Sequence, residues 1–209
     1  MSGAALRYLA LGDSYTIGTG ASHPSRNFPS LLAGRLEAAG GRSVEVSNPA
    51  INGFTTADLI REELPELIGF RPDLLTVLIG VNDLVAGDSD SAYRRQLGRI
   101  YGAIRQRLPP GRTTVISIPD FSLAPAASRF GAPPALRARV DAFNRIAEEV
   151  GSAHGFRYLD LVPVSRSGVG QPGWFADDQL HPGDRQYAAW AEWLWENLEE
   201  HWSVIAPAD

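Results

Sequence analysis

The sequence predicts an α/β domain in which helices cover both faces of a parallel sheet. Short, continuous apolar runs alternate along the chain with stretches whose apolar side chains recur every three or four positions. The runs are typical of strands buried on both faces, and the spaced stretches are typical of helices with one apolar face. Because right-handed crossovers favour an open sheet, this alternation predicts a doubly wound, three-layer α/β/α sandwich.

The apolar runs place five strands at residues 6–11, 44–47, 74–79, 114–118 and 156–161. Five strands are too few for an eight-stranded barrel. Apolar stripes predict helices around residues 28–36, 59–68 with a kink at Pro65, 93–108, 136–150 and 187–202. Two long loops rich in Pro, Gly and Ser, at residues 120–134 and 162–175, interrupt the alternation, and loops of this length often carry function.

The 209 residues contain no internal repeat and no linker, so a single domain spanning residues 1–209 is expected. The net charge is −5 without a basic cluster, which gives no support for a nucleic-acid or anionic-membrane partner. The chain has no Lys, which excludes lysine Schiff bases and phosphate-loop lysines. It has no Cys, which excludes thiol catalysis and disulfides.

The sequence also bears on location and assembly. No run approaches the roughly 18 apolar residues of a membrane span. The first residues, MSGAALRYLALGDS, lack the layout of a secretory signal, so a cytoplasmic location is expected. The aromatic-rich stretch at residues 187–202 fits either the core or a subunit contact, which leaves a homo-oligomer open.

Chemically capable residues follow four of the predicted strand regions. Ligands of open parallel sheets bind beyond the carboxyl ends of the strands, so these residues are expected at one edge. They supply a hydroxyl, a glycine turn, a carboxamide and a carboxylate–imidazole pair, which is the inventory of acyl transfer. The residues are Ser14, Gly53, Asn82, Asp178 and His181.

Together these segments resemble the GDSL/SGNH family of serine hydrolases. Its four blocks occur here in family order as Gly12-Asp13-Ser14, Asn52-Gly53, Gly80-Val81-Asn82-Asp83 and Asp178-Gln179-Leu180-His181. Tyr15 replaces the family's leucine at a position that is not catalytic. The resemblance implies a five-stranded sheet of flavodoxin-like order. It also implies hydrolysis of carboxylic esters through a Ser-His-Asp triad and a covalent acyl-enzyme, without metal or cofactor.

The resemblance assigns a role to each residue. Ser14 is the expected nucleophile, His181 the base and Asp178 the acid that orients it. The Ser14 N–H, the Gly53 N–H and the Asn82 side chain are the expected oxyanion donors. Each residue also has an ordinary explanation. Ser14 could cap a helix, Gly53 and Asn82 could serve only a turn, and the Asp-His pair could lie on the surface.

Other candidates for these roles are weaker. His23 lies in a polar loop, His154 near a helix end, and His201 at the far end of the last helix. Asp177 is the main rival of Asp178, and Asp184 is a weaker one. Asp13 and Asp83 are expected to brace loops, since a carboxylate facing the oxyanion would destabilise it. Trp174 and Phe175 could line a substrate pocket or anchor their loop.

The sequence is compatible with several functional alternatives. The same site would serve a thioesterase, a lysophospholipase, a carbohydrate acetyl esterase or an acyltransferase that uses an alcohol in place of water. From another class, the segment SYTIGTG after the first strand resembles a flavin phosphate loop. A non-catalytic binding module on a flavodoxin-like fold is a further alternative.

Overall fold

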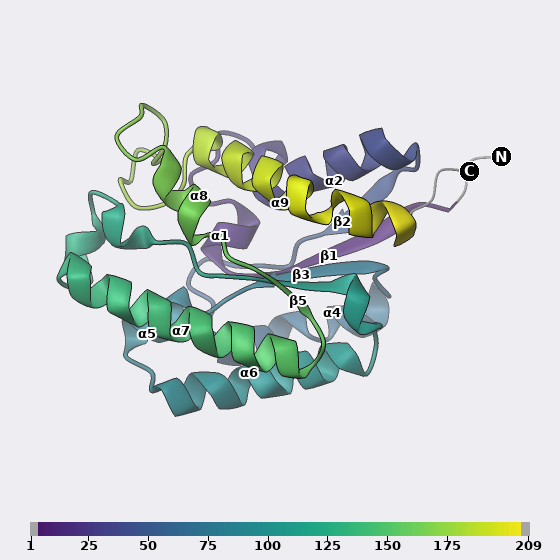
Figure 1. Ribbon diagram of the computed structural model, residues 1–209, viewed down its shortest axis with the longest axis horizontal. Coiled ribbons are helices and arrows are strands. Elements are labelled where there is room, and N and C mark those ends of the chain that lie inside the picture. The colour runs from purple at the N-terminus through teal and green to yellow at the C-terminus, as the bar shows by residue number, and fades with distance from the viewer. Residues whose placement is uncertain (1–3, 206–209) are drawn as a thin grey trace.

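The computed structural model describes residues 4–205, with side chains to residue 202. A five-stranded sheet forms the middle layer between two layers of helices (Figure 1). The strands are all parallel and lie in the order β2-β1-β3-β4-β5, which confirms the predicted sandwich and its flavodoxin-like order. They are β1 (Leu6–Gly12), β2 (Val44–Ser47), β3 (Leu74–Leu78), β4 (Thr113–Ile116) and β5 (Arg157–Leu159).

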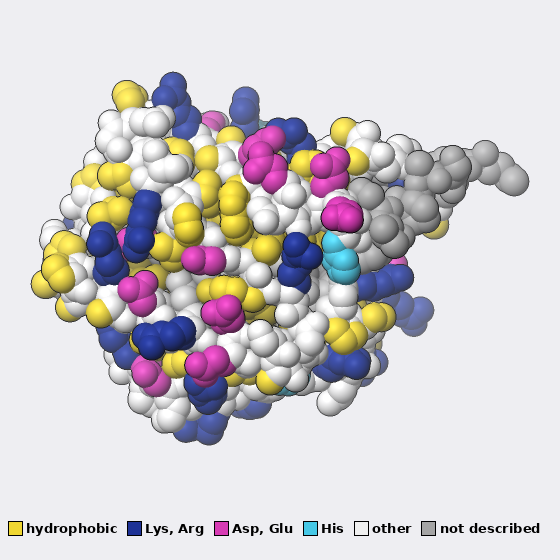
Figure 2. Space-filling model, in the orientation of Figure 1, with side chains coloured by type: hydrophobic (Ala, Val, Ile, Leu, Met, Phe, Trp, Pro, Cys, Tyr) yellow, Lys and Arg dark blue, Asp and Glu magenta, His cyan; other side chains and the backbone are white. Residues whose placement is uncertain are grey.

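Helices cover the sheet on both sides (Figure 1). One layer contains α1 (Ser14–Ile17), α2 (Phe28–Gly40), α8 (Val162–Ser167) and α9 (Asp184–Ile205). The other contains α4 (Glu66–Gly69), α5 (Val81–Ala86), α6 (Asp90–Arg105) and α7 (Pro133–Ala153). None of the helices in residues 4–205 has both the length and the hydropathy to cross a bilayer. Acidic, basic and apolar side chains are interspersed on the face shown in Figure 2.

The last helix belongs to the core of the domain. Its stripe of Tyr187, Trp190, Leu194, Leu198 and Trp202 is fully buried. The Trp202 ring meets Tyr8 of β1 edge to face, with ring centroids 5.5 Å apart. Of the two explanations for this aromatic stripe, packing within the chain is the one that the structure supports.

The outer strands differ from the prediction that all strands are buried on both faces. β2 and β5 are half-exposed because they form the two edges of the sheet. β4 ends at Ile116 rather than residue 118, because Ile118 exchanges two hydrogen bonds with the Asn144 side chain of α7 instead of a strand. β5 is shortened similarly, since the Leu161 amide donates to the Ser117 hydroxyl.

Two helical regions also differ from the prediction. The stretch at residues 59–68 is not one kinked helix. It consists of a π-helical turn (Leu59–Glu63), which continues α3 (Thr56–Asp58), and of α4, which begins after Pro65. Residues 162–175 are not entirely loop, because their first part forms α8. In the other long segment, two short 3₁₀ turns, Phe121–Leu123 and Ala127–Arg129, are present.

Candidate active site

The structure gathers the predicted residues at the carboxyl edge of the sheet. Ser14 begins α1 directly after β1, and Asn82 lies in the first turn of α5 after β3. The Asn82 side-chain amide donates to the Phe54 carbonyl, 2.8 Å away, which ties α5 to the turn that contains Gly53. The His181 ring packs against the ring of Tyr15, the residue after Ser14, with centroids 6.1 Å apart.

The nucleophile turn is fixed by its two preceding residues. Gly12 must be glycine, because a Cβ there would collide with the Leu78 carbonyl of β3 and the Thr16 hydroxyl of α1. Asp13 is the N-cap of α1, and its Oδ1 accepts the Tyr15 N–H at 3.0 Å. Ser14 is therefore not the helix cap. Its side chain is nearly buried, and as the first helical residue its amide has no intrahelical acceptor.

Asp178 and His181 form a direct pair. Asp178 Oδ2 lies 2.5 Å from His181 Nδ1, while Oδ1 accepts the backbone N–H groups of Leu180 and His181 at 2.9 Å each. Partial burial raises the pKa of Asp178, but these hydrogen bonds outweigh it and hold the pKa below its usual value. Asp178 is consequently ionised at neutral pH. In the described part of the chain, neither His181 Nε2 nor Ser14 Oγ makes a hydrogen bond.

The rival residues are bonded elsewhere. The His23 ring contacts Ser25 Oγ, the His154 ring contacts the Val150 carbonyl, and the His201 ring contacts the Gly111 carbonyl. Asp184 accepts the amide and hydroxyl of Ser22 at 2.8 and 2.6 Å. Among the described residues, Asp178 is the carboxylate that pairs with His181.

Gly53 lies in a turn closed by a hydrogen bond from the Phe54 amide to the Ile51 carbonyl. Its φ of +82° is the reason for glycine, since a Cβ would meet no atom within 4 Å. The Asn82 Nδ2 group carries two hydrogens, and one of them serves the Phe54 carbonyl. The second hydrogen remains available as a donor. The Gly53 turn and Asn82 can therefore both donate hydrogen bonds at this edge of the sheet.

Three buried acidic residues, Asp13, Glu63 and Asp83, lie in or next to the nucleophile turn. Asp83 accepts the amide and the hydroxyl of Thr56, and it braces the loop after Gly53 as expected. Burial raises the pKa of all three acids. It raises that of Asp13 to about 7, that of Glu63 to about 8 and that of Asp83 above its usual value. Glu63 Oε2 accepts the Gly12 N–H at 2.9 Å. Sequence reasoning missed Glu63, although its spacing of four from Leu59 and from Leu67 places it on their apolar face.

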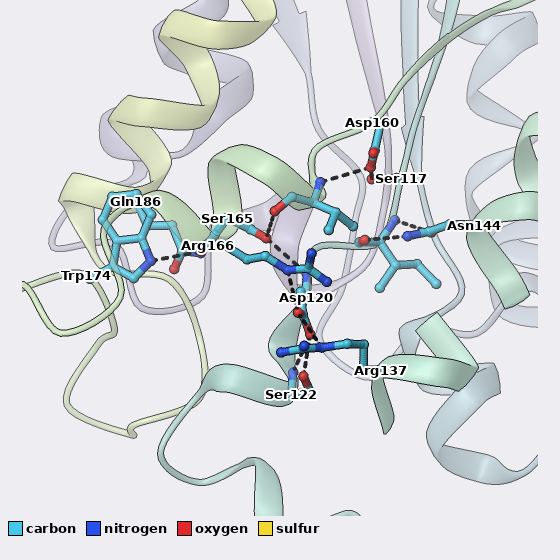
Figure 3. Close-up of polar contacts among 12 residues, drawn as sticks. Ser117, Asp120, Ser122, Arg137, Asn144, Asp160, Ser165, Arg166, Trp174 and Gln186 are labelled. Atoms are coloured by element: carbon cyan, nitrogen blue, oxygen red, sulfur yellow. Dashed lines mark hydrogen bonds and ion pairs between the residues drawn. The ribbon is translucent and has the colours of Figure 1, made fainter. Parts of the chain in front are cut away.

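A second polar network surrounds Asp120 (Figure 3). The Asp120 carboxylate is fully buried and accepts Arg166 Nε at 2.8 Å, with Arg137 Nε 3.4 Å away (Figure 3). Farther along the Asp120 segment, the Ala126 amide donates to the carbonyl of Gln179, the residue after Asp178. Sequence reasoning missed this network, because a lone Asp after a strand carries no distinctive pattern.

The two aromatic residues before the Asp-His pair have different environments. Trp174 is buried, and its Nε1 donates to the Ser165 carbonyl at 3.1 Å, so it anchors the loop. Phe175 is only half-buried and lines a hollow of about 540 Å³ next to Asp178. A second hollow, of about 460 Å³, lies beside the Gly53 turn and includes Ile17 and Ile51.

The fold and this collection of side chains define a class of protein: hydrolases with an α/β/α sandwich that cleave carboxylic esters. Residues 10–189 match the model of the GDSL-like Lipase/Acylhydrolase family, and the chain belongs to that family. The chain is therefore a carboxylic ester hydrolase.

Similar proteins agree with this assignment. The chain is 27% identical over 208 residues to an arylesterase from Vibrio mimicus, covering 96% of this chain and 92% of that protein. It is 26% identical over 193 residues to a lipase from Streptomyces rimosus, covering 74% and 69%. The crystal structure of a lipase/acylhydrolase from Enterococcus faecalis has a TM-score of 0.75 at 22% identity, covering 93% of this chain and 96% of that one.

Proposed function

We propose that the protein hydrolyses carboxylic esters through an acyl-enzyme, with Ser14, His181 and Asp178 as its catalytic triad. The observation that carries this proposal is the hydrogen bond between Asp178 and His181, on a loop whose histidine packs beside the Ser14 turn. The bond directs His181 Nε2, the opposite ring nitrogen, away from Asp178. Catalytic hydrogen bonds are often looser before substrate binds, so the missing Ser14–His181 bond does not argue against the pair.

The proposed reaction has two halves. Ser14 Oγ attacks the ester carbonyl while His181 takes its proton, and His181 then returns the proton to the leaving alcohol. In the second half, His181 removes a proton from water, which attacks the acyl-enzyme carbonyl; the acid is released as His181 returns the proton to Ser14 Oγ. Asp178 stabilises the imidazolium in both halves.

The negative charge on the carbonyl oxygen needs donors in both halves. The Ser14 N–H, the Gly53 N–H and the remaining Asn82 Nδ2 hydrogen are the proposed donors. A single oxyanion donor contributes about 3–4 kcal/mol to lowering the barrier. Asp13 and Asp83 do not take part directly, because Asp13 Oδ1 accepts the Tyr15 amide and both oxygens of Asp83 accept the Thr56 amide.

The two hollows beside the site are the proposed binding places for the acyl and alcohol groups. The hollow near Gly53 has exposed apolar walls, with Ile17 37% and Ile51 52% exposed. The hollow near Asp178 is more polar, with Asp177 and Arg185 in its lining. Thioester, lysophospholipid and carbohydrate acetate substrates, and transfer to an alcohol, would use the same triad.

The first experiment compares the parent with Ser14→Ala on p-nitrophenyl esters from acetate to palmitate. Loss of the nucleophile is expected to lower kcat by roughly 10³- to 10⁶-fold. Ser91→Ala, an exposed serine on α6, is the matched control and should keep parental rates. The acyl chain length with the highest kcat/KM then indicates how long an acyl group the binding hollow accommodates.

Labelling with a serine-directed fluorophosphonate separates the remaining possibilities. A parent that is inactive on every ester but is labelled at Ser14 has the proposed machinery and a more specialised substrate. A parent that is neither active nor labelled would favour a binding module. Full activity in Ser14→Ala would contradict the assignment of the nucleophile.

A further inference from the structure

Two buried acids behind the nucleophile turn have no role in the mechanism above. Asp13 and Glu63 are both completely buried. One oxygen of each carboxyl group accepts a backbone amide: Asp13 Oδ1 that of Tyr15, and Glu63 Oε2 that of Gly12. The other oxygens, Asp13 Oδ2 and Glu63 Oε1, are buried without any hydrogen-bond partner in the described part of the chain.

Among the residues that the structure describes, no cation forms an ion pair with Asp13 or Glu63. The arginine nearest to Glu63 in sequence, Arg61, pairs with Asp58 and Glu62 on the surface instead. The charged neighbours are acids as well: Asp83 of α5 raises the pKa of Asp13, and Asp13 raises that of Glu63. Two ionised carboxylates in such surroundings would be strongly unfavourable, so at least one of them keeps its proton. Burial raises the pKa of both acids, that of Asp13 to about 7 and that of Glu63 to about 8.

The position of Glu63 connects it to the nucleophile. Its bond to Gly12 fixes the last residue of β1, and Asp13 caps the helix that Ser14 begins. Together these two contacts hold the backbone on the amino-terminal side of Ser14 and at the start of α1. A second negative charge at this place would also oppose the developing oxyanion.

We propose that Glu63 is a positioning residue for Ser14, working as a neutral carboxylic acid. Its Oε2 accepts the Gly12 N–H, and its proton resides on Oε1, the oxygen that lacks a partner. The Asp13–Glu63 pair therefore carries at most one negative charge behind the nucleophile. The inference rests on the proposed role of Ser14.

The test compares three variants of the full chain. Glu63→Gln keeps a neutral side chain of the same shape whose oxygen can accept the Gly12 N–H, whereas Glu63→Leu removes the acceptor. Glu62→Gln makes the same chemical change one residue earlier, at an exposed position. The measurements are kcat, KM and the rate of fluorophosphonate labelling from about pH 5.5 to about pH 9, with circular dichroism to verify folding.

We expect Glu62→Gln to match the parent throughout. Glu63→Gln should stay within about threefold of the parental kcat near pH 6 and should lose less activity than the parent above about pH 8. Glu63→Leu should lose roughly 10- to 100-fold in kcat and in labelling rate, with KM nearly unchanged, because Ser14 is misplaced. If Glu63→Leu does not fold, the pH profile of Glu63→Gln decides.

Two results would overturn the proposal. One is a folded Glu63→Leu with the parental kcat and labelling rate. The other is a Glu63→Gln variant that is as impaired as Glu63→Leu near pH 6, or that shows the parent's alkaline loss unchanged. Failure of the proposed function would give a different set of results. Ser14→Ala would then remain active, while the pH dependence of unfolding in Glu63→Gln would still report on the acid pair.

Discussion

Asp177 and Asp178 are adjacent in sequence, but only Asp178 holds the ring of His181. Asp178→Asn is expected to lower kcat by roughly 10²- to 10⁴-fold with little change in KM, because an amide neither fixes the required tautomer nor stabilises the imidazolium. Steady-state kinetics on one activated ester measures the effect. Asp177→Asn is the comparison: its kcat should be near parental, and any effect of its place in the hollow should fall on KM. Equal losses in both variants would contradict the assignment of Asp178.

At the residue scale, motif residues were easier to predict than their supports. Ser14, Asn82, Asp178 and His181 follow strands or precede the last helix, so parallel strand ends bring them to one edge. Glu63 could not be assigned this way, because charged residues within helical stretches usually face solvent. Its burial depends on a hydrogen bond to Gly12, 51 positions away, which no local pattern encodes.

At the element scale, the close approach of β1 and β3 depends on Gly12. Gly12→Ala should lower the free energy of unfolding by about 1–3 kcal/mol, because its Cβ would press on a backbone carbonyl that cannot move freely. Urea unfolding measures this loss. Gly34→Ala is the control, since a Cβ there meets no atom within 4 Å and alanine favours the middle of a helix. A Gly12→Ala protein as stable as the parent would contradict this account of the turn.

The elements that the sequence predicted well are those with enough residues to show a period. The five strands were recognised by their continuous apolar runs, and the long helices α2, α6, α7 and α9 belong to the periodic group. The short helices α1, α5 and α8 do not, because four to six residues span too little of a repeat. The π-helical turn Leu59–Glu63 was missed since the same apolar spacing suits an ordinary helix.

At the scale of the whole molecule, the buried acids set the dependence of stability on pH. The folded-state pKa values of Glu63, about 8, and Asp13, about 7, lie above their ordinary values of 4.5 and 3.8. Between the ordinary and the raised pKa of each acid, the folded chain binds more protons than the unfolded chain. Its stability therefore falls as pH rises through this range. Asp58, Asp178 and Asp184 have lowered pKa values, and their stabilisation is lost only as the solution becomes acidic.

The measurement is urea unfolding at several pH values between about 4.5 and about 8.5. Each proton retained on folding makes the free energy of unfolding decline by up to about 1.4 kcal/mol per pH unit. Glu63→Gln should flatten this decline, whereas Glu62→Gln should not. A stability that rises steadily toward pH 8 would show that the acid pair is ionised in the folded protein.

The sequence pattern predicted the layers of the sandwich, while the order of its strands came from the family resemblance. Periodicity reports which face of an element is buried, but not which strand is its neighbour. The same limit explains why β2 and β5 were expected to be covered on both faces. Their exposure follows from their edge positions, which are a property of the assembled sheet.

The proposed triad draws its members from the two ends of the chain, and this has a consequence for biosynthesis. The ribosome makes Ser14 more than 160 residues before Asp178 and His181, which directly precede α9. Chains begin to fold from the amino terminus during synthesis. A growing chain can therefore form β1 with the serine in place while it still lacks a base, and hydrolytic capacity arrives only after the segment that carries His181 has been made.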